Sequence, residues 1–221
     1  MLRKLFDHTF IGDLFPRGGV VVDLGGNRGE FAREMRSLYD ARVYVVEPVP
    51  ELFNAIPKEK EVVGILAAVS GKNGEIEIFL PEGMCATMNS AAGGRSIIAK
   101  EYKYADLIAD HKIEKIDLLK MDIECAEISL IESLLPEDFN KITQCAVEFH
   151  DFLYPELGPR VEELKKKFED NGFYCIPFSL TTNGDVLFVK RGAIPFWKYA
   201  YLKYFARFWR GGIRKIKKIL K

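Results

Sequence analysis

A glycine-rich turn flanked by carboxylates is the first feature of this sequence that could do chemistry. It lies in the stretch VVVDLGGNRGEF, where Asp23 precedes the turn and Glu30 follows it. A loop that binds a dinucleotide has the spacing G-x-G-x-x-G and holds a pyrophosphate at a helix N-terminus. Gly26 and Gly29 fit its second and third glycines, but Leu24 stands at the first. Because two carboxylates would repel a pyrophosphate, we expect a cofactor with an ammonium and a sulfonium group, S-adenosylmethionine.

Further residues that could bind this cofactor follow other apolar runs. Glu47 ends the run RVYVVE, where its carboxylate could accept hydrogen bonds from both hydroxyls of a ribose. The alternative is a turn that only connects a strand to a helix. The residues expected to bind the cofactor are Asp23, Gly25, Gly26, Asn27, Gly29, Glu47, Pro48, Ala68 and Asp122.

Three more side chains lie where a proton could be removed from an acceptor. Methyl transfer from a sulfonium starts from an activated donor, so the protein mainly aligns the partners and removes a proton. His150 is the first choice of base because imidazole titrates near neutral pH, and Glu148 and Glu124 could orient it or bind acceptor hydroxyls. The alternatives are that His150 caps a strand at the surface and that Glu124 and Glu127 are solvated acids at a helix start, which suits Glu127 better.

The same region could also bind a metal ion. Asp122, Glu124, Glu148 and His150 offer carboxylates and one imidazole, a set that would suit Mg²⁺ or Mn²⁺. Nothing in their spacing demands an ion, so a metal is not favoured.

Alternating strand-like and helix-like segments must position these residues. The pattern of apolar residues predicts strands over 20–24, 42–47, 62–69, 115–122, 143–150, 173–177 and 185–190, and helices over 28–39, 50–56, 102–111, 126–135 and 161–171. A β-ribbon after the Asn73-Gly74 turn interrupts the alternation. This order predicts an α/β fold with a mostly parallel sheet, helices on both faces and a C-terminal antiparallel hairpin. Ligands bind such sheets at the carboxyl ends of the strands, where the strand order reverses.

Five sequence blocks resemble one methyltransferase family. DLGGNRGEF, VVEPVPELF, AAVSGKNGEIEI, DLLKMDIECAE and AVEFHDF occur in this order and are similar to those of the FkbM family of S-adenosylmethionine-dependent O-methyltransferases. The resemblance covers roughly residues 20–152, with a weaker fit to residue 190. It implies a Rossmann-like class I methyltransferase fold and methylation of a hydroxyl, commonly on a sugar or natural product. It also implies that Asp122 and Glu124 lie close to the methionyl end of the cofactor.

The chain departs from the family pattern at one position. The pattern usually reads K-x-D-x-E-G-x-E, and this chain has KMDIECAE, with Cys125 in place of the glycine. Cys125 would crowd a place where glycine allows close backbone approach, so it could reshape the acceptor pocket or reduce activity. If Cys125 reduces activity, the chain could instead be a catalytically silent module that binds the cofactor and docks partners. A nucleotide-dependent oxidoreductase is a further alternative, disfavoured by Asp23 and the incomplete glycine pattern.

The composition indicates a cytoplasmic globular protein. The chain has 221 residues, of which 48% are hydrophobic and 29% charged. Its four cysteines (Cys85, Cys125, Cys145 and Cys175) form no CxxC pair and follow no secretory signal, so we expect reduced thiols. No uncharged apolar run approaches the roughly 18 residues of a membrane span. The segment 83–94 could close as a lid over cofactor and acceptor, or be an ordinary surface loop.

The charges separate into an acidic body and a basic tail. All 32 acidic residues lie at or before Asp185, and eleven of the 32 basic residues lie from Lys190 onward. We therefore divide the chain into a methyltransferase domain, 1–190, and a tail, 191–221. Residues 196–221 predict an amphipathic helix that lies on an anionic membrane surface, which would suit a glycolipid acceptor at the inner face. The alternatives are packing on the domain or on a second subunit, and nucleic-acid binding, which the acidic body disfavours.

Overall fold

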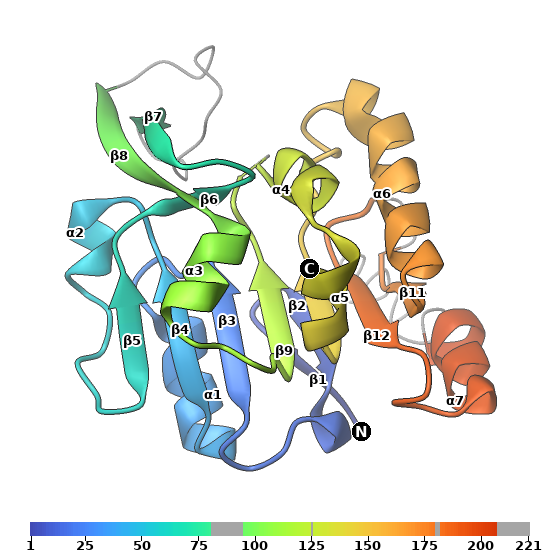
Figure 1. Ribbon diagram of the computed structural model, residues 1–221. Helices are drawn as coiled ribbons and strands as arrows, with labels where there is room; N and C mark the ends of the chain where they lie inside the picture. Colours follow the sequence, from blue (N-terminus) through green and yellow to red (C-terminus); the bar gives the residue numbers. More distant parts are fainter. Residues whose placement is uncertain (81–94, 125, 180–181, 207–221) are drawn as a thin grey trace, which may run out of the picture.

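The protein is an α/β fold built on one central sheet (Figure 1). The computed structural model describes residues 1–80, 95–124, 126–179 and 182–206. The central sheet has the strand order β11-β12-β10-β9-β3-β4-β5. These strands are β3 (Val20–Leu24), β4 (Arg42–Val46), β5 (Val62–Ile65), β9 (Leu118–Met121), β10 (Gln144–Val147), β11 (Phe173–Pro177) and β12 (Val186–Lys190). The first five pair in parallel, and β12 runs antiparallel to β10 and β11, so the predicted sheet with its C-terminal hairpin is confirmed.

The strand order reverses between β3 and β9. From β3 the chain continues to β4 and β5 on one side, and β9 and β10 extend the sheet on the other side. Asp23 of β3 lies opposite Lys120 of β9 in the register of this central pair. Since ligands bind such sheets at the carboxyl ends beside the reversal, this pair defines where a site should form.

Helices cover both faces of the sheet. Side chains of β3 alternate between two buried clusters: Val22 and Leu24 join one, and Val21 joins the other. The first cluster includes residues of α3, α4 and α6, and the second includes residues of α1, which lies behind the sheet in Figure 1. The helices are α1 (Glu30–Tyr39), α2 (Pro50–Phe53), α3 (Tyr104–Asp110), α4 (Glu127–Ser133), α5 (Pro136–Lys141), α6 (Gly158–Asp170) and α7 (Phe196–Tyr201), and a π-helical turn (Leu202–Ala206) follows α7.

A second, smaller sheet corrects two expectations. The strand predicted over 62–69 is divided: β5 ends in the central sheet, and β6 (Ala68–Ser70) joins a three-stranded sheet with the order β6-β8-β7. The expected ribbon is formed by β7 (Gly74–Leu80) and β8 (Arg95–Lys103). The sequence pattern missed β8, whose end also takes the first residues of the helix predicted over 102–111. Its partner in the ribbon lies across a long connection, so no tight turn marks it.

An N-terminal hairpin was not predicted. It consists of β1 (Leu2–Leu5) and β2 (His8–Ile11), and all four residues of β2 are buried. Thr9 donates from its N and Oγ1 to the Asp185 carboxylate, at 3.0 and 2.8 Å. The amide of Gln144 accepts from Ile11 N at 3.0 Å and donates to Ile11 O at 3.3 Å. The hairpin is therefore fixed to the central sheet by buried hydrogen bonds.

Several expectations concern parts that the structure does not describe. They are the lid predicted over 83–94, the effect of Cys125, the state of Cys85, and the tail beyond residue 206. Cys145 and Cys175 are buried free thiols. Among the described residues, no helix has both the length and the apolar character that a membrane span requires.

Candidate active site

A cavity of about 240 Å³ lies beside the reversal of strand order, lined by residues that follow β3, β4 and β9. Further walls come from the start of α1, from α2, from the strands β6 and β7, and from the N-terminal hairpin. Of the expected site residues, the cavity lining contains Gly25, Gly26, Asn27, Glu47, Pro48, Ala68, Asp122 and Glu124. It does not contain Asp23, Gly29, Glu148 or His150.

The glycine turn is held tightly between two strands. Gly25 and Gly26 both donate their N–H to the carbonyl of Val46, each at 3.0 Å. Gly25 has φ +76°, and a Cβ there would lie 1.8 Å from the Asp122 carbonyl oxygen. A Cβ on Gly26 would lie 2.0 Å from Val45 Cγ1. Only glycine fits these two positions, and the backbone of the turn therefore borders the cavity directly.

Glu47 links the end of β4 to the glycine turn. Its carboxylate is 4% exposed, and its two oxygens accept from Asn27 N at 2.8 Å and from Val49 N at 2.9 Å. Burial raises the pKa of Glu47 above its ordinary value, although the two backbone hydrogen bonds oppose the shift. Each oxygen keeps a second lone pair, so the carboxylate is oriented and can still accept from a ligand.

Asp23 was expected to bind the cofactor, but it lies beneath the turn and is not part of the cavity lining. Lys120 Nζ lies 3.0 Å from Asp23 Oδ1 and donates to the Gly25 carbonyl at 2.8 Å. Burial lowers the pKa of Lys120, but the charges of Asp23 and Asp122 outweigh it, and the net shift is upward. Asp23 therefore acts with Lys120 as a buried pair that supports the turn, and Lys120 compensates the charge that was expected to repel a pyrophosphate.

Three nitrogen groups surround Asp122 at the end of β9. His8 Nε2 lies 3.3 Å and Lys120 Nζ 3.6 Å from Asp122 Oδ2, and His150 Nε2 lies 3.8 Å from Oδ1. Burial raises the pKa of Asp122, but the hydrogen bond with His8 and the charges of Lys120 and His150 outweigh it. The pKa is therefore held well below its usual range. Asp122 remains an anion at any working pH.

His150 lies among carboxylates. Its Nε2 is 3.3 Å from Glu124 Oε2, and its Nδ1 is 3.3 Å from Glu127 Oε1. Burial lowers the pKa of His150, but Glu127, Glu124 and Asp122 together raise it to about 9. The imidazole therefore carries a proton at neutral pH. The alternative of a solvated acid at a helix start is wrong for Glu127, which is 1% exposed and also accepts from Ile123 N at 2.8 Å.

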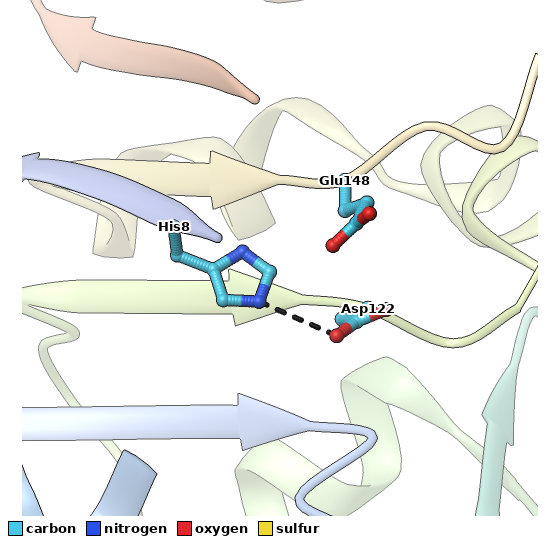
Figure 2. Close-up of side chains that lie close together, drawn as sticks. All are labelled: His8, Asp122 and Glu148. Atoms are coloured by element: carbon cyan, nitrogen blue, oxygen red, sulfur yellow. Dashed lines mark hydrogen bonds and ion pairs between the residues drawn. The ribbon is translucent and has the colours of Figure 1, made fainter. Parts of the chain in front are cut away.

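Glu148 follows β10, next to Asp122. Figure 2 shows His8 of β2 reaching across the end of β9 toward Asp122, with Glu148 at the end of the neighbouring strand. Burial and the nearby charge of Asp122 raise the pKa of Glu148 to about 7. This carboxyl group therefore changes its charge in the neutral range.

Two groups of side chains at this edge could hold a metal ion by their spacing. Ligand atoms within 4.8 Å of one another are offered by His8, Asp122 and Glu148, and by Asp122, Glu127 and His150. Asp122 belongs to both groups and already faces Lys120 and the protonated His150. Their positive charges oppose the binding of a cation there.

Comparison with known proteins identifies the family. The sequence profile described as "Methyltransferase FkbM domain" matches residues 23–175. The chain belongs to the FkbM methyltransferase family. Methyltransferase sdnD of Sordaria araneosa is 24% identical over 214 residues, an alignment that covers 77% of this chain and 80% of sdnD.

Solved structures similar to this FkbM methyltransferase are also methyltransferases or fibrillarins. The fibrillarin pre-rRNA processing protein of Methanococcus jannaschii has a TM-score of 0.47 and 17% identity, covering 86% of this chain and 69% of that protein. Aeropyrum pernix fibrillarin, solved with natively bound S-adenosylmethionine, has a TM-score of 0.46 and 11% identity, covering 79% of this chain and 66% of that protein. The FkbM family is one of S-adenosylmethionine-dependent methyltransferases, and this chain is an enzyme of that class.

Proposed function

We propose that this FkbM methyltransferase methylates a hydroxyl group on a sugar, in a glycan, a glycolipid or a natural product. The observation that carries the proposal is Glu148, a carboxyl group with a pKa of about 7 after the end of β10, with an oxygen within 4.8 Å of ligand atoms of His8 and Asp122, which line the cavity. An acceptor hydroxyl must lose a proton when it is methylated, and a base with a pKa near the working pH does this best.

The residues that line the cavity fit S-adenosylmethionine. Bound there, the cofactor supplies a methyl group that its positively charged sulfur has already activated. Glu47 offers a buried, oriented carboxylate to the two ribose hydroxyls. Gly26 and Asn27 line the cavity next to this carboxylate, and their backbone can lie against the cofactor. Glu30 and Glu124, which also line the cavity, provide negative charge for the ammonium and sulfonium, and Asp122 borders the cavity at the end of β9. Asp23 and Gly29 take positioning roles in this proposal, since neither lines the cavity.

We assign the base to Glu148 in preference to His150. A base must be unprotonated before it acts, and His150 has a pKa of about 9 and is a cation at neutral pH. Glu148 loses its proton near pH 7 and can then accept the proton of the acceptor hydroxyl at a carboxylate oxygen. His150 instead holds the carboxylates of Glu124 and Asp122 in place through its Nε2.

The first experiment is a calorimetric titration with S-adenosylhomocysteine, with NAD as the control ligand. Loss of the Glu47 carboxylate should lower the affinity for S-adenosylhomocysteine about ten- to a hundredfold, because the ribose hydroxyls lose their hydrogen bonds to a charged group. Glu47→Gln accompanies Glu47→Ala, because it keeps one oxygen acceptor. Glu34→Ala, an exposed change on α1, should bind like the wild type. No binding to the wild type, or a preference for NAD, would overturn the proposal and favour the silent-module or oxidoreductase alternatives.

We also propose that residues 196–221 contact an anionic membrane surface. In α7 and the turn after it, the exposed fractions are 68% for Phe196, 71% for Trp197, 56% for Tyr201, 58% for Tyr204 and 69% for Phe205. The opposite side packs on the domain. Exposed aromatic rings next to a basic segment suit the headgroup region of a bilayer.

The inner side of this segment limits how far the tail can move. Tyr199 stacks on Tyr174 of β11 with ring centroids 4.1 Å apart, and Leu202 is 5% exposed. The alternative of packing on the domain thus applies to one side of α7, and the other side remains available for a surface. In this proposal residues 191–221 form an anchor and residues 1–190 the methyltransferase domain.

A further inference from the structure

The imidazole of His150 lies between a carboxylate that lines the cavity and one that does not. Glu124 lines the cavity, and its side chain is 27% exposed. Glu127 is not part of the lining, and its side chain is 1% exposed. His150 Nε2 lies 3.3 Å from Glu124 Oε2, and His150 Nδ1 lies 3.3 Å from Glu127 Oε1. The three side chains therefore form a row that runs from the cavity into the interior of the protein.

This arrangement favours the charged form of His150. An ionised carboxylate only accepts hydrogen bonds, whereas a neutral imidazole has one N–H and one bare nitrogen. In the neutral form the bare nitrogen would face one of the two carboxylates, so the surroundings stabilise a ring with a proton on each nitrogen. Asp122 Oδ1, 3.8 Å from Nε2, adds a further negative charge beside the ring. The carboxylate that compensates this cation then decides how much negative charge is left at the cavity.

Glu127 is the carboxylate best placed to compensate His150. Its Oε1 also accepts from Ile123 N at 2.8 Å, which fixes the side chain to the segment that carries Glu124. Within the described part of the chain, His150 is the cation that pairs with Glu127. A buried charge without a partner is costly, so Glu127 and His150 stabilise each other. Asp122, by contrast, also faces Lys120 and His8.

We propose that Glu127 is a positioning residue that keeps the charge of Glu124 available to the sulfonium of the bound cofactor. Glu127 neutralises the imidazolium from the interior side, so the carboxylate of Glu124 keeps its negative charge on the cavity side. A sulfonium near Glu124 is then attracted more strongly than a neutral sulfur, because charges interact strongly where little water is present. This inference rests on the proposed function, because it takes Glu124 to face the sulfur of the cofactor.

Calorimetry with S-adenosylmethionine and S-adenosylhomocysteine tests this role, since the two differ by one methyl group and the charge that it places on sulfur. Glu127→Gln removes the charge but keeps an oxygen that can accept from Ile123 N. It should weaken binding of S-adenosylmethionine about three- to tenfold and of S-adenosylhomocysteine less than about twofold. Glu132→Gln, near the other end of α4 with a side chain that is 44% exposed, should bind both ligands like the wild type.

A double variant tests whether the charge of Glu127 acts through His150. Glu127→Gln with His150→Gln removes both charges of the pair and leaves neither charge unpaired. The ratio of the two dissociation constants should then stay within about twofold of the wild type. If Glu124 were instead the counter-ion of His150, the double variant would free it and bind S-adenosylmethionine more selectively than the wild type does. This comparison keeps the test decisive where Glu127→Gln alone unfolds.

The outcomes separate this inference from the proposed function. Equal weakening of both ligands in Glu127→Gln, or an unchanged ratio, would show that Glu127 acts on the structure alone and would overturn the inference. A stronger preference for S-adenosylmethionine in the double variant would overturn it as well. If the wild type binds neither ligand, the proposed function itself fails.

Discussion

Glu148 and His150 stand two residues apart and carry different charges at neutral pH. Burial dominates at Glu148 and raises its pKa to about 7, whereas at His150 the surrounding carboxylates overcome burial and raise the pKa to about 9. Environments that separate the pKa values of neighbouring groups often mark acid and base roles. The side chains of this pair therefore differ in charge at neutral pH although both follow the same strand, and we propose different roles for them.

This separation predicts the pH dependence of the reaction. The value of kcat/KM should rise as pH passes about 7, because Glu148 must lose its proton, and fall above about 9 as His150 loses its own. Asp122, Asp7, Glu124 and His150 all act on Glu148, so the profile reports apparent pKa values of the group. Glu148→Gln should lower kcat about a hundred- to ten-thousandfold and abolish the acidic limb. An acidic limb that survives in this variant would contradict the assignment.

Most site residues were predictable because they follow apolar strands. The side chains that they contact were not predictable. The apolar runs alone predict that Glu47, Asp122 and Glu148 lie at one edge of the sheet, because each residue follows the end of a parallel strand. The role of Lys120 depends on its register opposite Asp23, and the charge of His150 depends on burial beside Glu127. Register and burial are properties of the folded sheet, so local sequence does not contain them.

At the scale of elements, the glycine turn joins β3 to α1 by fitting between two strands. Gly25 and Gly18 share nearly the same φ, +76° and +75°, but only Gly25 has neighbours that a Cβ would strike. The two positions thus separate the cost of the left-handed backbone from the cost of steric overlap.

Alanine at these two positions should destabilise the protein by different amounts. Gly18→Ala should cost about 1–2 kcal/mol, the strain of the left-handed backbone alone. Gly25→Ala should cost about 1–3 kcal/mol more, because the Cβ overlaps the Asp122 carbonyl. Gly25→Ala should also lower the affinity for S-adenosylhomocysteine, since the turn borders the cavity. Urea unfolding measures the stabilities, and equal losses would show that the turn relaxes without strain.

Two of the elements that sequence reasoning missed, β8 and the N-terminal hairpin, depend on distant partners. A third, α5, begins at Pro136, directly after the helix predicted over 126–135. Strands with their own apolar runs, such as β3 and β9, were located correctly. By contrast, β8 depends on β7, and the N-terminal hairpin depends on Asp185 and Gln144. Such pairing overrides local propensity, so neither β8 nor the hairpin is marked by its own sequence alone.

On the scale of the whole molecule, the proposed anchor and the active site lie at different parts of the sheet. Figure 1 shows α7 beside β11 and β12, away from the carboxyl ends of β3 and β9. The exposed aromatic side of α7 therefore leaves the cavity uncovered. In the proposed arrangement the enzyme would sit on a membrane with its cavity open to an acceptor.

Membrane contact should be lost when the exposed aromatic rings of α7 are removed. We expect the wild type to float with anionic vesicles and much less with neutral vesicles, because both apolar burial and lipid charge contribute. Phe196→Ala with Trp197→Ala should abolish most of this flotation. Ile98→Ala, a comparably exposed apolar change on β8, serves as the control. Flotation that is unchanged in the double variant, or that ignores lipid charge, would overturn the membrane proposal.

The bonds from Thr9 to Asp185 also bear on how the chain reaches its active form. They join residues 176 positions apart, so the wall that carries His8 forms only after almost the entire described chain has been synthesised. The strands β3, β4 and β9, whose ends border the cavity, are complete well before that point. A nascent chain would therefore form the strands around the glycine turn first, and the last step of folding, closure of a very long loop, would add the wall of the cavity that the N-terminal hairpin contributes.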